Sequence, residues 1–327
     1  MNVLVTGGTG FVGAHLVKAL RARGDVVTVI ARRPALAETL GWGPEVKLVR
    51  GGLDDEAGLR AGCAGADVVY HVAGKIAARS AADFMATNRD GTANVLEAAR
   101  DGGVRRFVYV SSLAVGGPTT PGHPIDEQRP PQPVTDYGRS KLAAEVLVRA
   151  MPASLPWTIV RPPLVYGEWD RGTLKIFQFV RRGVAPVFGD GSQELSVIHG
   201  EDLAQSLIAA GTAPAAAGRI YFASHPTTTT SRELVLAAGR ALGRGTRPSI
   251  VPVPPIVARG VLWTIGTIAY LAGRATLLSA DKAHEFLAPA WTCSSDALTR
   301  DTGWRAAIDL ETGLKRAANW YREMGWL

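Results

Sequence analysis

Short apolar runs alternate with longer segments of helical periodicity through the first half of the chain. Apolar runs of strand length occupy residues 3–6, 26–31, 46–49, 67–73, 106–111 and 157–161. Between them, the spacing of apolar residues predicts amphipathic helices over residues 11–23, 84–101 and 137–150. Strands that alternate with helices in this way favour the α/β class, a parallel sheet with helices on both faces.

The alternation stops after the run at 157–161, because the two prolines that follow cannot continue a ladder of hydrogen bonds. A Gly- and Arg-rich stretch at 166–196 shows no clear period and is predicted to be irregular. Residues 200–211 and 219–223 are predicted to be a helix and a strand that return to the sheet. The capping box Thr230-Ser-Arg-Glu233 starts a further helix, and the chain beyond it is predicted to be helical and broken by prolines.

This change of pattern predicts two domains. We expect residues 1–165, joined by 197–224, to form a dinucleotide-binding domain built on the parallel sheet. Residues 166–196 and 225–327 are expected to form a smaller, mostly helical substrate-binding domain, so that the chain crosses the boundary more than once.

The longest apolar stretch lies between Arg259 and Arg274 and carries no charged residue. It predicts one helix within residues 256–273, shorter than the roughly 20 residues that a helix needs to span a bilayer. Such a helix either packs in the core of the smaller domain, borders a substrate pocket or lies on a membrane surface. The sequence leaves these locations open.

Composition narrows the class of protein further. Apolar residues make up 46% of the 327 residues, which is enough for a sizeable core. The two cysteines and six histidines show no metal-ligand spacing, so no metal site is predicted. The net charge of +7 comes from dispersed basic residues without an aromatic-interleaved stripe, which argues against nucleic-acid binding. A strand that begins at residue 3 leaves no signal segment before it, and this favours the reducing cytoplasm.

Three glycines follow the first apolar run at intervals of three residues. Gly7, Gly10 and Gly13 stand directly after a strand and at the start of a helix, which is the context of a dinucleotide-binding turn. Glycines there permit a tight bend, close approach of the backbone to a pyrophosphate, and close packing of helix on strand. The N terminus of the helix offers free N–H groups to the phosphates. A Walker-type loop is excluded, because no Gly-Lys-Ser/Thr follows.

The end of the second strand bears on the choice between NAD and NADP. A carboxylate at this place holds the ribose 2′-OH of NAD, whereas an arginine accommodates the 2′-phosphate of NADP. The chain reads Ala31-Arg32-Arg33 here. Two arginines in place of the acid favour NADP, with NAD as the alternative.

A second group of polar residues follows the fifth strand. Ser111 and Ser112 end that strand, and Tyr137 and Lys141 stand four residues apart in a predicted helix. Residues at this spacing lie on one helix face, so the lysine ammonium is expected to lower the pKa of a phenol that starts at about 10. The phenol would then donate or accept a proton near neutral pH.

Taken together, these residues resemble the extended short-chain dehydrogenases/reductases over essentially the whole chain. The matching segments are Thr6-Gly-Gly-Thr-Gly-Phe-Val-Gly13, His71-Val-Ala73, Asn88-Arg-Asp-Gly-Thr92, Ser111-Ser112, Tyr137-x-x-x-Lys141 and Arg161-Pro-Pro-Leu-Val-Tyr-Gly167. The resemblance implies a Rossmann-type doubly wound parallel sheet with a smaller C-terminal substrate domain.

The resemblance also implies roles for single residues. Ser112 is expected to bind the substrate oxygen, and Tyr137 to act as the general acid/base. Lys141 is expected to depress the pKa of Tyr137 and to hold the nicotinamide ribose, while Asn88 resembles the family's asparagine that keeps the conformation beside the lysine. The implied cofactor contacts are Gly7, Thr9, Gly10, Phe11, Val12, Gly13, Arg32, Arg33, Leu53, Asp54, Val72, Ala73, Tyr137, Lys141, Pro162 and Val165.

The chain departs from the family pattern at three places. Gly51-Gly52 replaces an aspartate that contacts adenine in many members, which leaves this contact to Leu53 or Asp54. Leu195 stands where sugar-nucleotide enzymes carry an arginine that grips the substrate diphosphate, and the charge of Glu194 beside it would repel that group. Two apolar residues follow Ser112 where sugar dehydratases carry acids.

These departures favour the branch of 3β-hydroxysteroid dehydrogenases and dihydroflavonol-type reductases. The expected activity is NADP-dependent interconversion of a secondary alcohol and a ketone on a small steroid-, flavonoid- or lipid-like substrate. A NAD-dependent nucleotide-sugar epimerase and a non-catalytic NADP-binding sensor are the alternatives. Homodimerisation and membrane contact through residues 256–273 stay open.

Overall fold

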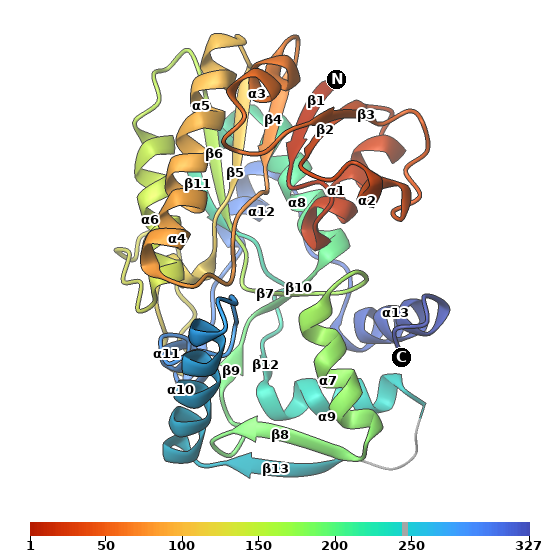
Figure 1. Ribbon diagram of the computed structural model, residues 1–327, viewed down its shortest axis with the longest axis vertical. Helices are drawn as coiled ribbons and strands as arrows, with labels where there is room; N and C mark the ends of the chain where they lie inside the picture. The colour runs from red at the N-terminus through yellow and green to blue at the C-terminus, as the bar shows by residue number, and fades with distance from the viewer. Residues whose placement is uncertain (244–247) are drawn as a thin grey trace.

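The fold centres on a parallel sheet that the N-terminal half of the chain builds almost alone. The computed structural model describes residues 1–243 and 248–327, and within them the largest sheet has seven strands in the order β11-β6-β5-β4-β1-β2-β3 (Figure 1). These strands are β1 (Asn2–Thr6), β2 (Val26–Ala31), β3 (Lys47–Arg50), β4 (Val68–His71), β5 (Arg106–Val110), β6 (Trp157–Arg161) and β11 (Arg219–Phe222). The strand order reverses between β1 and β4, so the predicted doubly wound α/β class is confirmed.

Helices cover both faces of this sheet, because successive side chains of each buried strand point to opposite sides. On β1, Val3 and Val5 belong to the core with α1 (Phe11–Ala22) and α8 (Gly200–Thr212). Leu4 belongs to the opposite core, with α3 (Glu56–Cys63), α5 (Gly91–Asp101) and α6 (Asp136–Arg149). The sequence missed α3, and the single helix expected at 84–101 is divided into α4 (Ala81–Met85), a π-helical turn (Ala86–Asp90) and α5.

A smaller part, at the lower end of Figure 1, is assembled from two distant segments of the chain. The first segment supplies α7 (Arg171–Arg181), β8 (Val184–Phe188) and β9 (Glu194–Leu195). The second supplies β12 (Thr229–Thr230), α9 (Ser231–Ala241), β13 (Ser249–Val253), α10 (Pro255–Leu271), α11 (Ala283–Phe286), β14 (Ala290–Trp291) and α13 (Leu310–Glu323). Strand pairing joins them, since β8 pairs with β13 and β9 lies between β12 and β14.

The prediction that residues 166–196 are irregular is therefore wrong. In α7, Leu174, Phe177 and Val180 recur at helical spacing and are buried in the core of the smaller part. The glycines that suggested irregularity lie in turns instead, as at Gly183 before β8, where φ is +83°. The strands β13 and β14 also interrupt the chain after Glu233, which was expected to be helical and broken by prolines.

Short elements connect the two parts. β7 (Leu164–Tyr166) pairs in parallel with β10 (Val197–His199) directly below the large sheet (Figure 1). Between β14 and α13, the chain returns to the large sheet through α12 (Asp296–Thr302), whose Leu298 is buried in the same core as α8. The remaining elements are α2 (Ala35–Glu38) and two 3-10 turns, Leu113–Val115 and Pro214–Ala216.

The apolar helix predicted within 256–273 is present as α10, at the edge of the smaller part. Ala258 and Leu262 are buried, but most of the other apolar residues face outward. A core location is therefore wrong for this helix. None of the helices in the described part of the chain combines the length and the apolar character needed to cross a membrane.

Candidate functional site

A cavity of about 1130 Å³ lies at the carboxyl ends of β1, β2, β4 and β5. This is the edge of the sheet where its strand order reverses, the usual location of ligands in open α/β sheets. The large sheet forms one wall, and residues of the smaller part, from Gln193 to Trp291, form the other. Every residue predicted to contact the cofactor lines this cavity.

The glycine turn after β1 brings neighbouring backbone segments closer together than any residue with a β-carbon would allow. Gly7 has φ of +72°, and a β-carbon there would lie 2.6 Å from the Ala73 amide nitrogen. A β-carbon at Gly13 would overlap the Gly7 carbonyl oxygen. The first turn of α1 has no acidic residue and no side-chain cap, so its N–H groups stay available for an anion. These features fit a bound dinucleotide.

At the end of β2, Arg32 and Arg33 line the same cavity with exposed side chains. Leu53 and Asp54 lie opposite, after β3. The Leu53 carbonyl oxygen accepts a hydrogen bond from Asn94 Nδ2 at 2.8 Å, which uses one of its two lone pairs within the protein.

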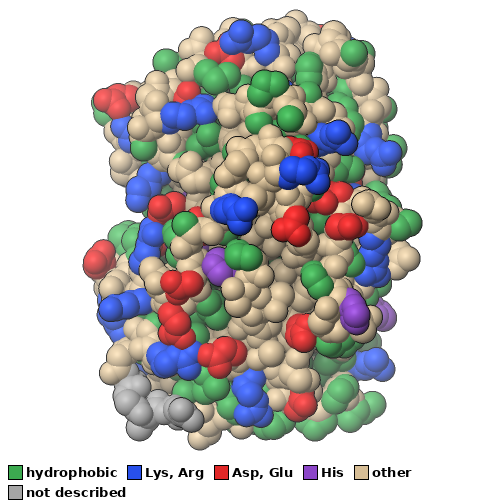
Figure 2. All heavy atoms as spheres, turned by 180° about the vertical axis from the view of Figure 1, so that it is seen from behind, with side chains coloured by type: hydrophobic (Ala, Val, Ile, Leu, Met, Phe, Trp, Pro, Cys, Tyr) green, Lys and Arg blue, Asp and Glu red, His purple; other side chains and the backbone are tan. Residues whose placement is uncertain are grey.

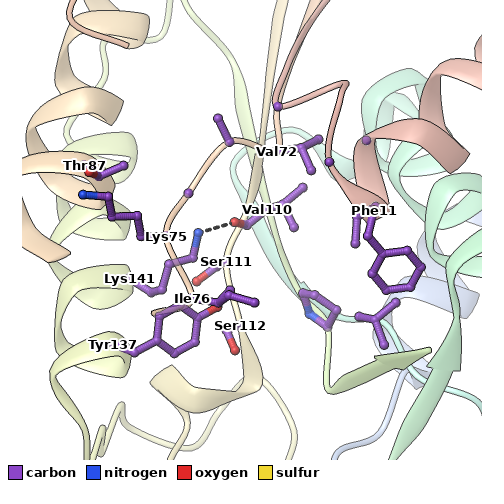
Figure 3. Close-up of a pocket in the computed structure, with 18 of the residues that line it drawn as sticks. Phe11, Val72, Lys75, Ile76, Thr87, Val110, Ser111, Ser112, Tyr137 and Lys141 are labelled. Carbon is purple, nitrogen blue, oxygen red and sulfur yellow. Dashed lines mark hydrogen bonds between the residues drawn. The ribbon is translucent and has the colours of Figure 1, made fainter. Parts of the chain in front are cut away.

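The predicted catalytic residues come together at the middle of the cavity (Figure 3). Thr135 caps α6 by accepting a hydrogen bond from the Gly138 amide at 3.2 Å, and this places Tyr137 in the first turn. Figure 3 shows Tyr137 and Lys141 one turn apart on α6, with Ser112 across from the Tyr137 ring. Ser112 Oγ accepts a hydrogen bond from the Ala114 amide at 3.1 Å, which fixes its hydroxyl group beside Tyr137 in the cavity.

The pKa of Tyr137 differs from the expectation. Burial raises the pKa of Tyr137 to about 12, although the neighbouring Ser112 hydroxyl opposes this shift and the charge of Glu285 adds to it. The phenol is therefore protonated at neutral pH, and the prediction that the pKa of Tyr137 is lowered is wrong for this structure.

The reason lies in the direction of the lysine side chain. Lys141 Nζ donates a hydrogen bond to the Val110 carbonyl oxygen at 2.6 Å and lies 4.4 Å from the centre of the Tyr109 ring. Burial lowers the pKa of Lys141 to about 7, partly opposed by the charge of Glu145. An ammonium has three N–H donors, and the hydrogen bond to Val110 uses one of them. The cavity-lining lysine thus retains donors for a ligand.

Two other predicted residues act on the site from behind it. Asn88 is buried on the π-helical turn, where its Oδ1 accepts from the Lys75 amide at 2.7 Å and its Nδ2 donates to Ser140 Oγ at 2.9 Å. It holds the loop after β4 against α6 rather than facing the cavity. Ser111, the first serine of the pair, donates to Glu145 Oε1 at 2.5 Å, which leaves Ser112 as the serine that meets Tyr137.

Several cavity residues were not found from the sequence. Lys75 and Asp83 form an ion pair at one rim, and Lys282 and Glu285 form another beside the catalytic tyrosine. Lys282 Nζ lies 4.7 Å from the centre of the Tyr137 ring. The wall that the smaller part forms also contributes four apolar side chains, Leu195, Leu277, Phe286 and Trp291, beside the polar Gln193 and Ser196. No local motif marks these residues, because tertiary packing alone brings them to Tyr137.

Residues 3–223 match the family model of the NAD dependent epimerase/dehydratase family. The chain belongs to this family. The match covers the glycine turn, the serine pair and the Tyr137/Lys141 pair. The resemblance to the extended short-chain dehydrogenases/reductases is thereby confirmed, and the protein is an NAD(P)-dependent enzyme of the oxidoreductase/epimerase type.

Epimerase/dehydratase relatives extend over nearly the whole chain. Ceramide reductase from Caulobacter vibrioides is 35% identical over 329 residues, which is 99% of this chain and 96% of the relative. UDP-glucose 4-epimerase from Vibrio cholerae is 28% identical over 97% of this chain and 94% of its own length. The crystal structure of DesIV, a dTDP-glucose 4,6-dehydratase from Streptomyces venezuelae with NAD bound, superimposes with a TM-score of 0.79 at 26% identity, covering 100% of this chain and 98% of DesIV.

Proposed function

We propose that the protein is an NADP-dependent oxidoreductase that interconverts a ketone and a secondary alcohol on an apolar, lipid-like molecule. The observation that carries this proposal is that Ser112 and Tyr137 line one cavity together with the apolar side chains of Leu195, Leu277, Phe286 and Trp291. A carbonyl oxygen seated between the two hydroxyl groups would leave the rest of its molecule against Leu277, Phe286 and Trp291. The 35% identity to a ceramide reductase supports a substrate of this kind.

In this proposal the chain holds the cofactor at the glycine turn, with Arg32 and Arg33 at the 2′-phosphate and Lys141 at the nicotinamide ribose. The bound nicotinamide supplies or accepts the hydride. Tyr137 donates its phenolic proton to the carbonyl oxygen during reduction and takes it back during oxidation. Ser112 orients that oxygen by a hydrogen bond. Because the pKa of Tyr137 is about 12, the protonated form that ketone reduction consumes predominates at neutral pH.

The cavity argues against a nucleotide-sugar substrate. Leu195 lines the wall where a diphosphate would need a cation, and a leucine offers no hydrogen bond. The two lysines at the substrate end, Lys75 and Lys282, are already paired with carboxylates. Glu194 turns away and accepts a hydrogen bond from the Gly122 amide at 2.7 Å. A non-catalytic sensor is disfavoured because Ser112, Tyr137 and Lys141 meet in one cavity.

The test pairs turnover with ligand binding. Purified protein is assayed for NADPH oxidation on long-chain ketones, and calorimetry measures UDP-sugar binding to the NADP-loaded protein. We expect turnover on apolar ketones and no saturable binding of UDP-sugars at low micromolar concentration. Micromolar UDP-sugar binding together with no turnover on any ketone would replace this proposal with the epimerase.

We predict that Arg32→Ala weakens NADP binding roughly 10- to 100-fold, because a charge-assisted hydrogen bond contributes about 1.5–3 kcal/mol. The affinity for NAD should change little, since NAD lacks the 2′-phosphate. Titration of both cofactors measures this, with Arg50→Ala as a matched control, because Arg50 ends the next strand and does not line the cavity. If the unmodified protein binds NAD more tightly than NADP, the choice of cofactor is wrong.

We also predict that kcat/KM for ketone reduction falls as the pH rises above about 7. Burial lowers the pKa of Lys141 to about 7, so its ammonium is present below that pH and lost above it. The phenol of Tyr137 stays protonated over the same range, because its pKa is about 12. A profile measured between about pH 6 and pH 9 reports these free-enzyme groups.

Lys141→Arg provides the control for this profile, because a guanidinium remains charged throughout. Its rate is expected to be lower, and its profile should lose the fall near pH 7. A fall of the same position and size in Lys141→Arg would assign the titration to another group.

A further inference from the structure

The outer face of α10 exposes more apolar surface than a solvated helix tolerates. Of the described residues, seven large hydrophobic side chains that are exposed belong to this one helix: Ile256, Val257, Val261, Trp263, Ile268, Tyr270 and Leu271. Their exposed fractions range from 49% to 79%. Contiguous apolar surface of this kind marks an interaction site rather than random exposure.

The helix has a definite inner and outer side. Ala258 and Leu262 are buried, and the helix packs on α11. Close contact is made at Gly266, where a β-carbon would lie 3.1 Å from Ser279 Cα. The inner face of α10 is thus buried against the rest of the protein. The exposed apolar residues occupy the remaining circumference, and α10 lies at the lower left edge of the molecule in Figure 1, which is the lower right edge in the reverse view of Figure 2.

The charge around this face has one sign. From Pro254 to Ala280 the sequence contains two arginines and no aspartate or glutamate. These two, Arg259 and Arg274, are exposed on and just after α10. An apolar helix whose own charged residues are all basic complements a surface that is both apolar and anionic.

We propose that the outer face of α10 docks on an anionic lipid surface. Trp263 and Tyr270 have the amphipathic rings that settle at the boundary between head groups and acyl chains. The helix has 17 residues, so it lies on the surface instead of spanning it.

A second copy of the chain is a poorer occupant of this face. A symmetric dimer would place the same surface on both sides of its interface. The face offers no carboxylate to Arg259 or Arg274, so the arginines of the two copies would meet without a partner. An anionic head group supplies the missing charge.

The docking also explains the position of α10 beside the cavity. The chain that follows the helix supplies Leu277, Lys282, Glu285 and Phe286 to the cavity wall. Thr135, the cap of the catalytic helix, donates a hydrogen bond to Glu285 at 2.6 Å. A lipid surface under α10 therefore lies next to the wall that an apolar substrate would pass. The docking itself stands whether or not the proposed ketone is the substrate.

Vesicle flotation of the full chain tests this inference. The probes are phosphatidylcholine vesicles with and without phosphatidylglycerol, in low and high salt. We expect binding to the anionic vesicles that weakens in high salt, and little binding to the neutral ones. Replacing Trp263 and Ile268 by serine should weaken vesicle binding roughly 30-fold or more, because two large apolar side chains lose their burial.

A second pair of variants separates charge from apolar contact. Arg259→Ala with Arg274→Ala should weaken binding to anionic vesicles roughly 25-fold, because each basic residue near such a surface contributes about 1 kcal/mol. The matched control replaces Val146 and Met324 by serine, since these side chains are 55% and 47% exposed on other elements. Circular dichroism and turnover of a water-soluble ketone verify that every variant is folded.

Three results would overturn the proposal. The first is wild-type protein that stays with the unbound fraction on anionic vesicles. The second is equal binding to neutral and anionic vesicles, which would remove the role of the arginines. The third is a wild-type dimer in sedimentation velocity that the Trp263/Ile268 variant breaks while vesicle binding is unchanged, which would assign the face to a second copy.

Discussion

Tyr137→Phe should reduce kcat for ketone reduction by roughly 100- to 10,000-fold, the usual loss when a general acid is removed. The substitution takes away only the phenolic oxygen, which lies beside Ser112 in the cavity. The ring remains, so its contact with the Lys282 ammonium, 4.7 Å from the ring centre, is retained. NADP affinity is therefore expected to stay within a few-fold of wild type. Single-turnover kinetics and cofactor titration measure the two effects separately.

Tyr70→Phe is the matched control for this variant. Tyr70 is fully buried on β4, does not line the cavity and has no hydrogen-bond partner for its hydroxyl among the described residues. Its loss should leave kcat unchanged. A Tyr137→Phe protein that binds NADP normally and turns over within about ten-fold of wild type would remove Tyr137 from the proposed chemistry.

The cofactor end of the site was predictable because its information is local. Gly7, Gly10 and Gly13 lie within one strand–turn–helix unit, so their spacing alone defines the bend and the uncapped helix N terminus. The same holds for the alternation of strands and helices, which follows from the period of buried side chains. The predicted parallel sheet and the family membership are both confirmed on this basis.

The substrate end was not predictable because its contacts are distant in sequence. Thr135 and Glu285 are hydrogen-bonded although 150 residues separate them. β8 finds its partner only in β13, so neither strand gives a strong signal alone. The cavity wall that faces Tyr137 forms only when these distant segments pack together. No motif in residues 277–291 predicts that they line the cavity.

The pKa of Tyr137 shows a further limit of spacing arguments. A four-residue interval places Tyr137 and Lys141 on one helix face. This interval does not determine the position of the Lys141 ammonium group, because the lysine side chain is flexible. Here the ammonium donates to the Val110 carbonyl oxygen, and burial dominates the pKa of both side chains. The helix α10 shows a similar limit. The hydropathy of residues 256–273 predicted that a helix forms there, but it did not determine which face of the helix is exposed.

One structural pair was overlooked although both of its residues lie in recognised segments. Arg161 ends β6 and Glu145 lies on α6, and their side chains are 3% and 1% exposed. Arg161 Nε donates to Glu145 Oε1 at 2.9 Å, and Nη2 donates to Oε2 at 2.6 Å. Ser111 adds a third hydrogen bond to the same carboxylate. This network ties the catalytic helix to the strands that carry the serine pair.

Arg161→Ala should lower the free energy of unfolding by about 3–5 kcal/mol, because it leaves a buried carboxylate without its counter-ion. Urea denaturation followed by circular dichroism measures this loss. The control combines Arg161→Met, Glu145→Leu and Ser111→Ala, which removes all the polar partners together and leaves apolar groups of similar size. Replacing a whole buried ion pair in this way is often neutral, so most of the lost stability should return. If Arg161→Ala costs less than about 1 kcal/mol, the buried carboxylate has found another partner and the network does not hold α6 to the sheet.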